Sequence, residues 1–278
     1  MITATEINEI IRTSKKRTLR FDDTIVGQVI IPAGTYARAF EFDQILGGLV
    51  VGGYNLPGCK LGSFREADHK IENRGNPDLI EYGGAWLQPK VKGDRPIAEG
   101  LKINANINAL GGRAAFYGTA LHKCHLAIHA ANATHHGVML DKCHSTYLRG
   151  SAVGIGVAGK TGQGYACQIK AGFLCSVNHW HVQGARSGVQ LSHGGNANFV
   201  RGLSGELWPG GIWADIHGGN EQHPFFDVPE VKIGNEAWTG EPYSVQFGPS
   251  VRRVIAIEVR PGVTLGVPVE VPIEVAGA

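Results

Sequence analysis

Charged residues are scarce in this sequence. Only 18% of its 278 residues are Asp, Glu, Lys or Arg, and the formal net charge is +2. Because 43% of the residues are apolar, a disordered chain is excluded, since such chains combine low hydrophobicity with high net charge. The sequence also lacks any continuous apolar run of about 18 residues, so we expect no membrane insertion.

An export signal and a disulfide framework are missing as well. Glu6 and Glu9 stand where a signal peptide would need an apolar run. The five cysteines are odd in number, which favours buried thiols over a set of disulfides.

Glycine, in contrast, is abundant. The 40 glycines are about twice the usual share for a chain of this length. Many glycines with few charges are typical of short strands joined by tight turns. The length allows one elongated domain or two compact ones.

The first 20 residues have the pattern of a short helix. Thr3 and Glu6 have the spacing of a capping box. The apolar residues that follow on one face are Ile7, Ile10 and Ile11. Such a helix could cover the end of a stack of strands whose edges would otherwise be exposed.

From about residue 25 the hydrophobic period changes to two, and no long amphipathic helix follows. The clearest alternation is Leu101 to Ala109, in which Lys102 and three asparagines alternate with apolar residues. This pattern predicts a strand with one face in water.

Two short motifs recur along the chain. Leu121-His122-Lys123-Cys124-His125 returns 19 residues later as Leu140-Asp141-Lys142-Cys143-His144, and His193-Gly194-Gly195-Asn196 returns 24 residues later at 217–220. Units this small cannot bury an apolar face alone, so they must stack. A coil of parallel strands fits and predicts that Cys124 and Cys143 are neighbours in an interior column, which Cys175 could continue.

The segment Val29-Ile30-Ile31-Pro32-Ala33-Gly34-Thr35-Tyr36, with the glycine-bounded strand at 49–53, resembles the opening of pectate-lyase-like β-helix proteins. This group includes bacteriophage tailspikes, polysaccharide lyases and related glycosidases. The resemblance implies an all-β, right-handed parallel β-helix. We expect a capping helix or anchor at 1–24, the β-helix at 25–240, and a strand region at 241–278 that either pairs between subunits or caps its own coil.

The resemblance also implies a function and an assembly. We expect a homotrimeric spike on a virion surface, extracellular after lysis, that binds capsule or lipopolysaccharide and contacts other virion proteins. The first alternative is a polysaccharide lyase or glycosidase of the same fold. The second is a structural particle component without a ligand.

The charges are concentrated in the middle of the chain. Residues 101–205 hold nine Lys or Arg, one acid, and nine of the 12 histidines. This favours an anionic partner, although a solvated surface would have the same composition. No nucleic-acid-binding motif is present, so we expect no nucleic-acid partner. The partner that the resemblance implies is an anionic or neutral polysaccharide.

Candidate sugar-binding residues come from the recurring motif and from a turn-rich stretch. Alternation turns the side chains next to the two cysteines outward in stacked pairs, where an acidic sugar or solvent counter-ions could balance them. Indole faces suit sugar rings. The candidates are Lys123, His125, Lys142, His144, Trp208 and Trp213. In His179-Trp180-His181 we expect a buried indole between two surface imidazoles.

The sequence predicts no metal site, and it offers one set of residues for a glycosidase and another for a lyase. Each Cys and the following His should lie on opposite faces, so we predict no zinc site, no other metal and no cofactor. A glycosidase would need two carboxylates, from Glu206, Asp215 or Glu230, and the first and last could stack. A lyase would need a cation and a base. The residues available for that chemistry are Lys142, His144, Tyr147 and Arg149.

Overall fold

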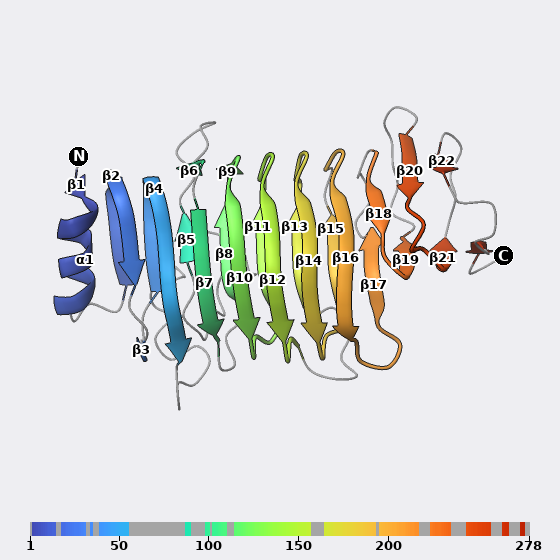
Figure 1. Ribbon diagram of the computed structural model, residues 1–278, viewed down its shortest axis with the longest axis horizontal. Coiled ribbons are helices and arrows are strands. Elements are labelled where there is room, and N and C mark those ends of the chain that lie inside the picture. Colours follow the sequence, from blue (N-terminus) through green and yellow to red (C-terminus); the bar gives the residue numbers. More distant parts are fainter. Residues whose placement is uncertain are drawn as a thin grey trace.

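The chain is a parallel β-solenoid of about 6 turns with a short helix at its N-terminal end (Figure 1). The computed structural model describes residues 2–14, 18–31, 34–35, 39–55, 87–89, 98–100, 102–109, 114–156, 164–192, 195–216, 223–234, 243–256, 263–266 and 273–275. Every strand pairing among these residues is parallel. The predicted all-β parallel β-helix is therefore confirmed, while its right-handed sense stays a prediction.

Two long sheets form the sides of the solenoid. The larger one, sheet A, contains in spatial order β1 (Ile2–Thr3), β2 (Thr18–Ile31), β4 (Ala39–Asn55), β7 (Lys102–Asn108), β10 (His125–Ala131), β12 (Tyr147–Val153), β14 (Ser176–Gln183), β16 (Phe199–Glu206), β18 (Phe225–Asp227), β20 (Tyr243–Phe247) and β22 (Val263–Gly266). Two further strands pair with β4, namely β3 (Gly34–Thr35) and β5 (Leu87–Pro89).

The second sheet, sheet B, lies behind sheet A in Figure 1. Its strands are, in spatial order, β23 (Ile273–Val275), β21 (Arg253–Ala256), β19 (Glu230–Ile233), β17 (Ile212–Ile216), β15 (Ser187–Ser192), β13 (Tyr165–Lys170), β11 (His136–Asp141) and β8 (Ala114–Thr119). A short pair, β6 (Ala98–Glu99) with β9 (Leu121–His122), lies outside both sheets.

The predicted N-terminal helix is confirmed as α1 (Ala4–Thr13), with a complete capping box between Thr3 and Glu6. Ile7 and Ile11 are buried, but Ile10 is 37% exposed because it lies at the edge of the apolar face. The helix also covers the end of the stack. The Asn8 side-chain oxygen accepts a hydrogen bond of 2.8 Å from the Ile30 amide of β2, which satisfies one donor beside the first coil.

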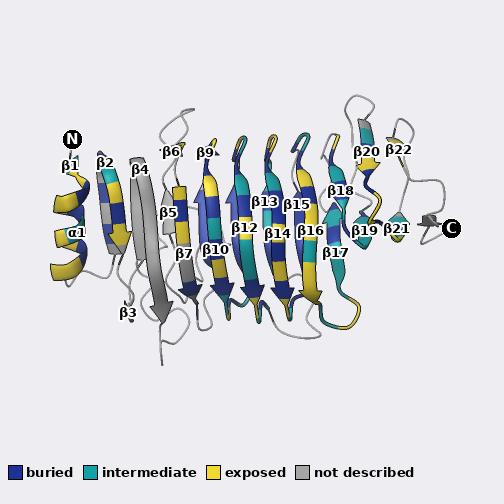
Figure 2. Ribbon diagram, viewed as in Figure 1, coloured by how far each residue is buried: buried dark blue, intermediate teal, exposed yellow. Residues whose placement is uncertain are grey.

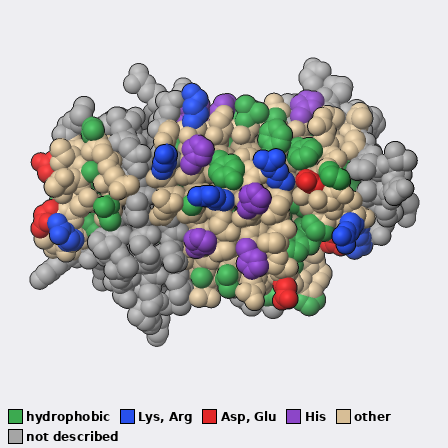
Figure 3. All heavy atoms as spheres, in the orientation of Figure 1, with side chains coloured by type: hydrophobic (Ala, Val, Ile, Leu, Met, Phe, Trp, Pro, Cys, Tyr) green, Lys and Arg blue, Asp and Glu red, His purple; other side chains and the backbone are tan. Residues whose placement is uncertain are grey.

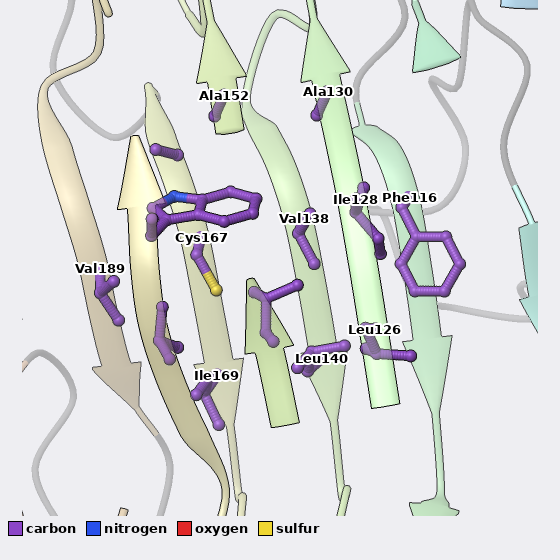
Figure 4. Close-up of a cluster of buried hydrophobic side chains, with 14 of the residues drawn as sticks. Phe116, Leu126, Ile128, Ala130, Val138, Leu140, Ala152, Cys167, Ile169 and Val189 are labelled. Atoms are coloured by element: carbon purple, nitrogen blue, oxygen red, sulfur yellow. The ribbon is translucent and has the colours of Figure 1, made fainter. Parts of the chain in front are cut away.

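The core is built from inward-facing residues of both sheets. In β10 the burial alternates, with Leu126, Ile128 and Ala130 buried and the residues between them more accessible (Figure 2). Figure 4 shows these side chains meeting Val138 and Leu140 of β11 between the two sheets. Each large apolar side chain buried in this way contributes about 1.5–3 kcal/mol.

The corner that connects sheet B to sheet A, at residues 120–124 in one coil and 142–146 in the next, explains why the 19-residue spacing of the recurring motif is not the true repeat of the coils. Ala120 and Lys123 both have left-handed backbone conformations, and Lys142 and Ser145 repeat them in the next coil. Each left-handed residue is followed by a buried one, so a corner contains the same local pattern twice, three residues apart. The recurring motif at 121–125 and 140–144 therefore matches the second half of one corner with the first half of the next.

The observed register is 22 residues in this part of the chain, since His129 bonds to Ser151 of the following coil and His125 pairs with Tyr147. Cys124 accordingly aligns with Thr146, not with Cys143. The prediction of a single column is therefore wrong. Cys124 and Cys143 are nevertheless interior neighbours as predicted, since both are fully buried and, besides this burial, the Cys124 thiol helps to raise the pKa of Cys143.

Two coils beyond Thr146, the side-chain amide of Asn198 ties two coils together inside this corner. Its oxygen accepts from the Cys175 amide at 2.9 Å, and its nitrogen donates to the Gly172 carbonyl at 2.9 Å. Asn198 is fully buried, so both groups of its side chain must be satisfied internally.

The C-terminal strands continue the same two sheets of this chain. β20 pairs with β18 and β22, and β21 pairs with β19 and β23. At the other end, β2 runs across residue 24, where we placed the first boundary. The division at residues 24 and 240 and pairing between subunits stay predictions.

Candidate anion-binding groove

The outer face of sheet A carries exposed basic side chains. In β7, β10 and β12 the residues that alternate with the core point outward, among them Lys102, His125 and Arg149, which are exposed. Figure 3 shows Lys, Arg and His side chains gathered over the middle of this face. In the described strands β7, β10, β12, β14 and β16 the only acidic residue is Glu206, at the end of β16.

A groove crosses three neighbouring strands of this face. It has a volume of about 520 Å³ and is lined by Lys102, Asn104, His125, Leu126, Ala127, Tyr147 and Arg149. The parallel register places Ala127 between Asn104 of β7 and Arg149 of β12. Because Ala127 has only a methyl group, its position forms the floor between longer side chains.

The groove combines charge with hydrogen-bonding groups. Lys102 and Arg149 supply permanent positive charges, and Asn104 and Tyr147 can donate hydrogen bonds. The rings of His125 and Tyr147 lie 5.9 Å apart with a tilt of 43°. A guanidinium can hold a carboxylate, sulfate or phosphate through two hydrogen bonds, so the lining suits an anionic group.

The basic face continues beyond the groove at a bulge in β14. His179 has a left-handed backbone, with φ of 51°, and the register shifts opposite Leu148 and Gly150. The extra residue keeps His179 exposed on the outer face while Trp180 is fully buried. The neighbouring Arg201 donates from Nε to the Asn178 side-chain oxygen, which fixes its direction.

The predicted basic residues are exposed, but their pairing differs from the expectation. Lys123, Lys142, His125 and His144 all reach the surface. His125 pairs with Tyr147 and lines the groove, whereas His144 lies at the corner, bridged to His122 with ring centroids 5.0 Å apart. Lys123 and Lys142 do not stack, because they occupy the two different left-handed positions of the corner.

The two candidate tryptophans lie away from the groove. Trp208 is half-buried in the connection between β16 and β17, where its amide donates to Ala185 at 2.9 Å. Trp213 is half-buried at the start of β17 and packs against the core. Sugar contact by either indole stays a prediction. The buried Trp180 between exposed His179 and His181 is confirmed.

The candidate carboxylates are distributed over both sheets. Glu206 ends β16 and pairs with Gln183 in sheet A, while Glu230 begins β19 in sheet B, so the expected stack of these two residues is not formed. Glu230 lies 3.8 Å from Arg253, and Asp215 accepts from the Ser187 hydroxyl at 3.1 Å. Among the described residues that line the groove, none is a carboxylate of the kind that a glycosidase uses in pairs.

The cysteine and histidine side chains of the recurring motif diverge as expected. Cys124 and Cys143 are fully buried, while His125 and His144 are exposed. Burial raises the pKa of the Cys143 thiol and of the Cys167 thiol well above the ordinary value, so both are neutral thiols that pack as small apolar groups. Within the described ranges, no three His, Cys, Asp or Glu side chains converge as metal ligands would.

Sequence reasoning named His125, Tyr147 and Arg149 but not the groove that they share. Lys102 and Asn104 were visible in the alternation of 101–109, and Ala127 carried no signal of its own. Only the observed register, 23 residues from β7 to β10 and 22 residues from β10 to β12, brings these three strands together.

The fold and the groove together define a parallel β-solenoid protein with a basic outer face. No family model, no curated protein and no solved structure matches the chain. No helix in the described part of the chain has the length and hydrophobicity needed to cross a membrane.

Proposed function

We propose that this protein binds an anionic polysaccharide along the outer face of sheet A. The observation that carries the proposal is the groove itself, where Lys102, His125 and Arg149 surround a small floor residue and no carboxylate is among the described lining residues. Positive side chains without partners of opposite charge raise the local concentration of anions. A sheet face that is extended and open also suits a long ligand.

The biological setting belongs to the same proposal. The opening segment resembles that of β-helix spikes, so we propose that the chain forms a right-handed homotrimeric spike on a virion and grips capsule or lipopolysaccharide of a host. Support comes from the parallel solenoid and from the basic face. Contacts with other virion proteins would then involve surfaces outside the groove.

Affinity measurements with immobilised acidic and neutral polysaccharides test the binding. We expect binding to an acidic polymer that falls about tenfold in Arg149→Gln, because one guanidinium contact of the anion is lost. Arg252→Gln is the matched control, since Arg252 is exposed on the connection before β21 and lies outside the groove. Equal loss in both variants, or no binding to any acidic polymer, would refute the proposal and favour a structural component without a ligand.

A polysaccharide lyase is the second candidate, and one observation favours it. The groove brings together a guanidinium, an ammonium, an imidazole and a phenol, from Arg149, Lys102, His125 and Tyr147. A lyase needs a cation to neutralise a uronate and a base to remove the neighbouring proton. Incubation with acidic polymers, followed by the ultraviolet absorbance of unsaturated products, distinguishes this enzyme from a binder. Turnover that is abolished in Tyr147→Phe would establish the lyase.

A further inference from the structure

The permanent positive charges of the basic face recur on every second strand. Lys102 lies in β7, Arg149 in β12 and Arg201 in β16, and all three are exposed on the outer face of sheet A. One strand separates each from the next, β10 in the first case and β14 in the second. Because neighbouring strands are about 4.8 Å apart, these cations repeat at about 9–10 Å along the solenoid.

The intervening strands carry histidines instead. β10 has His125 and His129 on its outer face, and β14 has His179 and His181. The pattern is therefore one Lys or Arg on a strand, two His on the next, and so on across five strands. The permanent positive charges of Lys and Arg are therefore confined to alternate strands of these five.

The two guanidiniums are positioned differently but face the same strand. Arg201 is held by its Nε bond to Asn178 of β14, so its remaining donors lie beside that strand. Arg149 lies along the opposite edge of β14, between Leu148 and Gly150, where the register shifts beside the bulge at His179. In the groove, one step earlier, Arg149 lies beside Ala127 of β10, and Lys102 lies on the other side of β10 beside His125, two residues along the strand from Ala127.

We infer that the ligand is a linear polysaccharide with one anionic group on every second sugar, lying along the solenoid axis. An extended chain of pyranose rings advances by a distance similar to one strand spacing per ring, so alternate sugars match alternate strands. The charged sugars then meet Lys102, Arg149 and Arg201, and the neutral sugars lie over the histidine-bearing strands. This inference rests on the proposed function and specifies the class of polysaccharide.

Hexasaccharides that differ only in charge spacing test the inference. A hyaluronan hexasaccharide carries three carboxylates on alternate sugars, and a polygalacturonate hexasaccharide carries six. We expect the hyaluronan fragment to bind at least as tightly at pH 7.5, although it has half the charge. A simple attraction between opposite charges would favour the fragment with six carboxylates by about tenfold or more.

Substitutions distinguish recognition of the spacing between carboxylates from a general attraction between opposite charges. Arg201→Gln should weaken the hyaluronan hexasaccharide about tenfold and leave the disaccharide unchanged, because a disaccharide presents a single carboxylate and cannot span two cations. Arg252→Gln should change neither. Circular dichroism confirms that each variant is folded, which we expect because these side chains are exposed.

The outcomes divide the two proposals. Tighter binding of the polygalacturonate fragment, still sensitive to Arg149→Gln, would overturn the alternate spacing and leave polysaccharide binding in place. Binding of neither hexasaccharide, or stronger binding of a single-stranded DNA of equal charge, would overturn the proposed function itself.

Discussion

The two sheets of the solenoid have the same parallel strand pairing, but their outer faces differ in how accessible they are to solvent. In sheet A the outward side chains, such as His129 and Arg149, are exposed. In sheet B, β11 and β15 are buried at every position, on both faces. Val138 and Leu140 belong to the core, so Met139 and Asp141 must point away from it, and they too are hardly accessible.

Buried polar side chains on sheet B bond to one another. The Tyr117 hydroxyl donates to Asp141 at 3.1 Å, and the Gln168 side-chain nitrogen donates to Gln190 at 2.6 Å. On sheet A, outward polar side chains such as His129 and Arg149 are exposed instead, with the buried Asn178 as an exception. The difference teaches that parallel pairing alone does not decide which outer face is accessible, and that the accessible face of the two is the one of sheet A.

The largest effect is expected from damage to the backbone of sheet A beside the groove. Gly150 has φ of 130°, and a Cβ there would lie 1.9 Å from the Ile128 carbonyl oxygen. Gly150→Ala should lower the free energy of unfolding by about 4 kcal/mol, because strain and a backbone clash combine. Urea denaturation measures this change.

Gly100→Ala is the control for that variant. Gly100 also has positive φ, of 67°, but a Cβ there would meet nothing within 4 Å. We expect a cost of only about 1–2 kcal/mol, from the left-handed backbone alone. Equal costs for the two substitutions would show that the close approach of β10 and β12 at Gly150 is not rigid.

A direct comparison of the two outer faces is expected to give the next largest effect. Met139→Ala in sheet B should lower the free energy of unfolding by about 3 kcal/mol, because a buried side chain is removed. His129→Ala in sheet A should change it by no more than about 0.5 kcal/mol, since the side chain is exposed. A reversed order in thermal or urea unfolding would contradict the assignment of the two faces.

The smallest effect is expected from the thiols, which probe the interior that both sheets share. Burial raises the pKa of Cys143 and of Cys167 above the ordinary 9.0, so neither should react with iodoacetamide at pH 8.5 in the folded protein. Peptide mapping by mass spectrometry measures the labelling, with the urea-unfolded chain as the positive control.

The same shift sets a pH dependence. A thiol whose pKa is raised by folding contributes stability that is complete below the unfolded pKa and is lost as the pH rises further. For these two cysteines, stability should therefore be constant up to about pH 8 and decline above pH 9 as the unfolded chain ionises. Rapid labelling of either thiol at neutral pH would show that the core is open.

The strands were predictable because apolar and polar residues alternate along the sequence where a strand has one buried and one exposed face. Lys102 and Asn104 alternate with the buried Ile103, and the capping box at Thr3 and Glu6 marks the helix. Parallel stacking followed from units too short to fold alone. These features depend on neighbouring residues, which a sequence displays directly.

The register was not predictable because the corner carries no conventional turn signal. Left-handed positions usually select Gly or Asn, whereas here they are occupied by residues such as Ala120, Lys123, Lys142 and Leu174. The resemblance of two halves of one corner then produced a false period. The groove depends on that register, since Ala127 acquires its role only between Asn104 and Arg149.

The buried Asn198 has a consequence for shortening the chain. Its amide completes the hydrogen bonds of Cys175 and Gly172, which belong to the preceding coil. A truncated protein that stopped just before Asn198 would thus leave a donor and an acceptor of its own last coil unsatisfied. A shortened version that keeps the coil of Gly172 and Cys175 therefore has to include Asn198, so an internal amide decides where such a fragment can end.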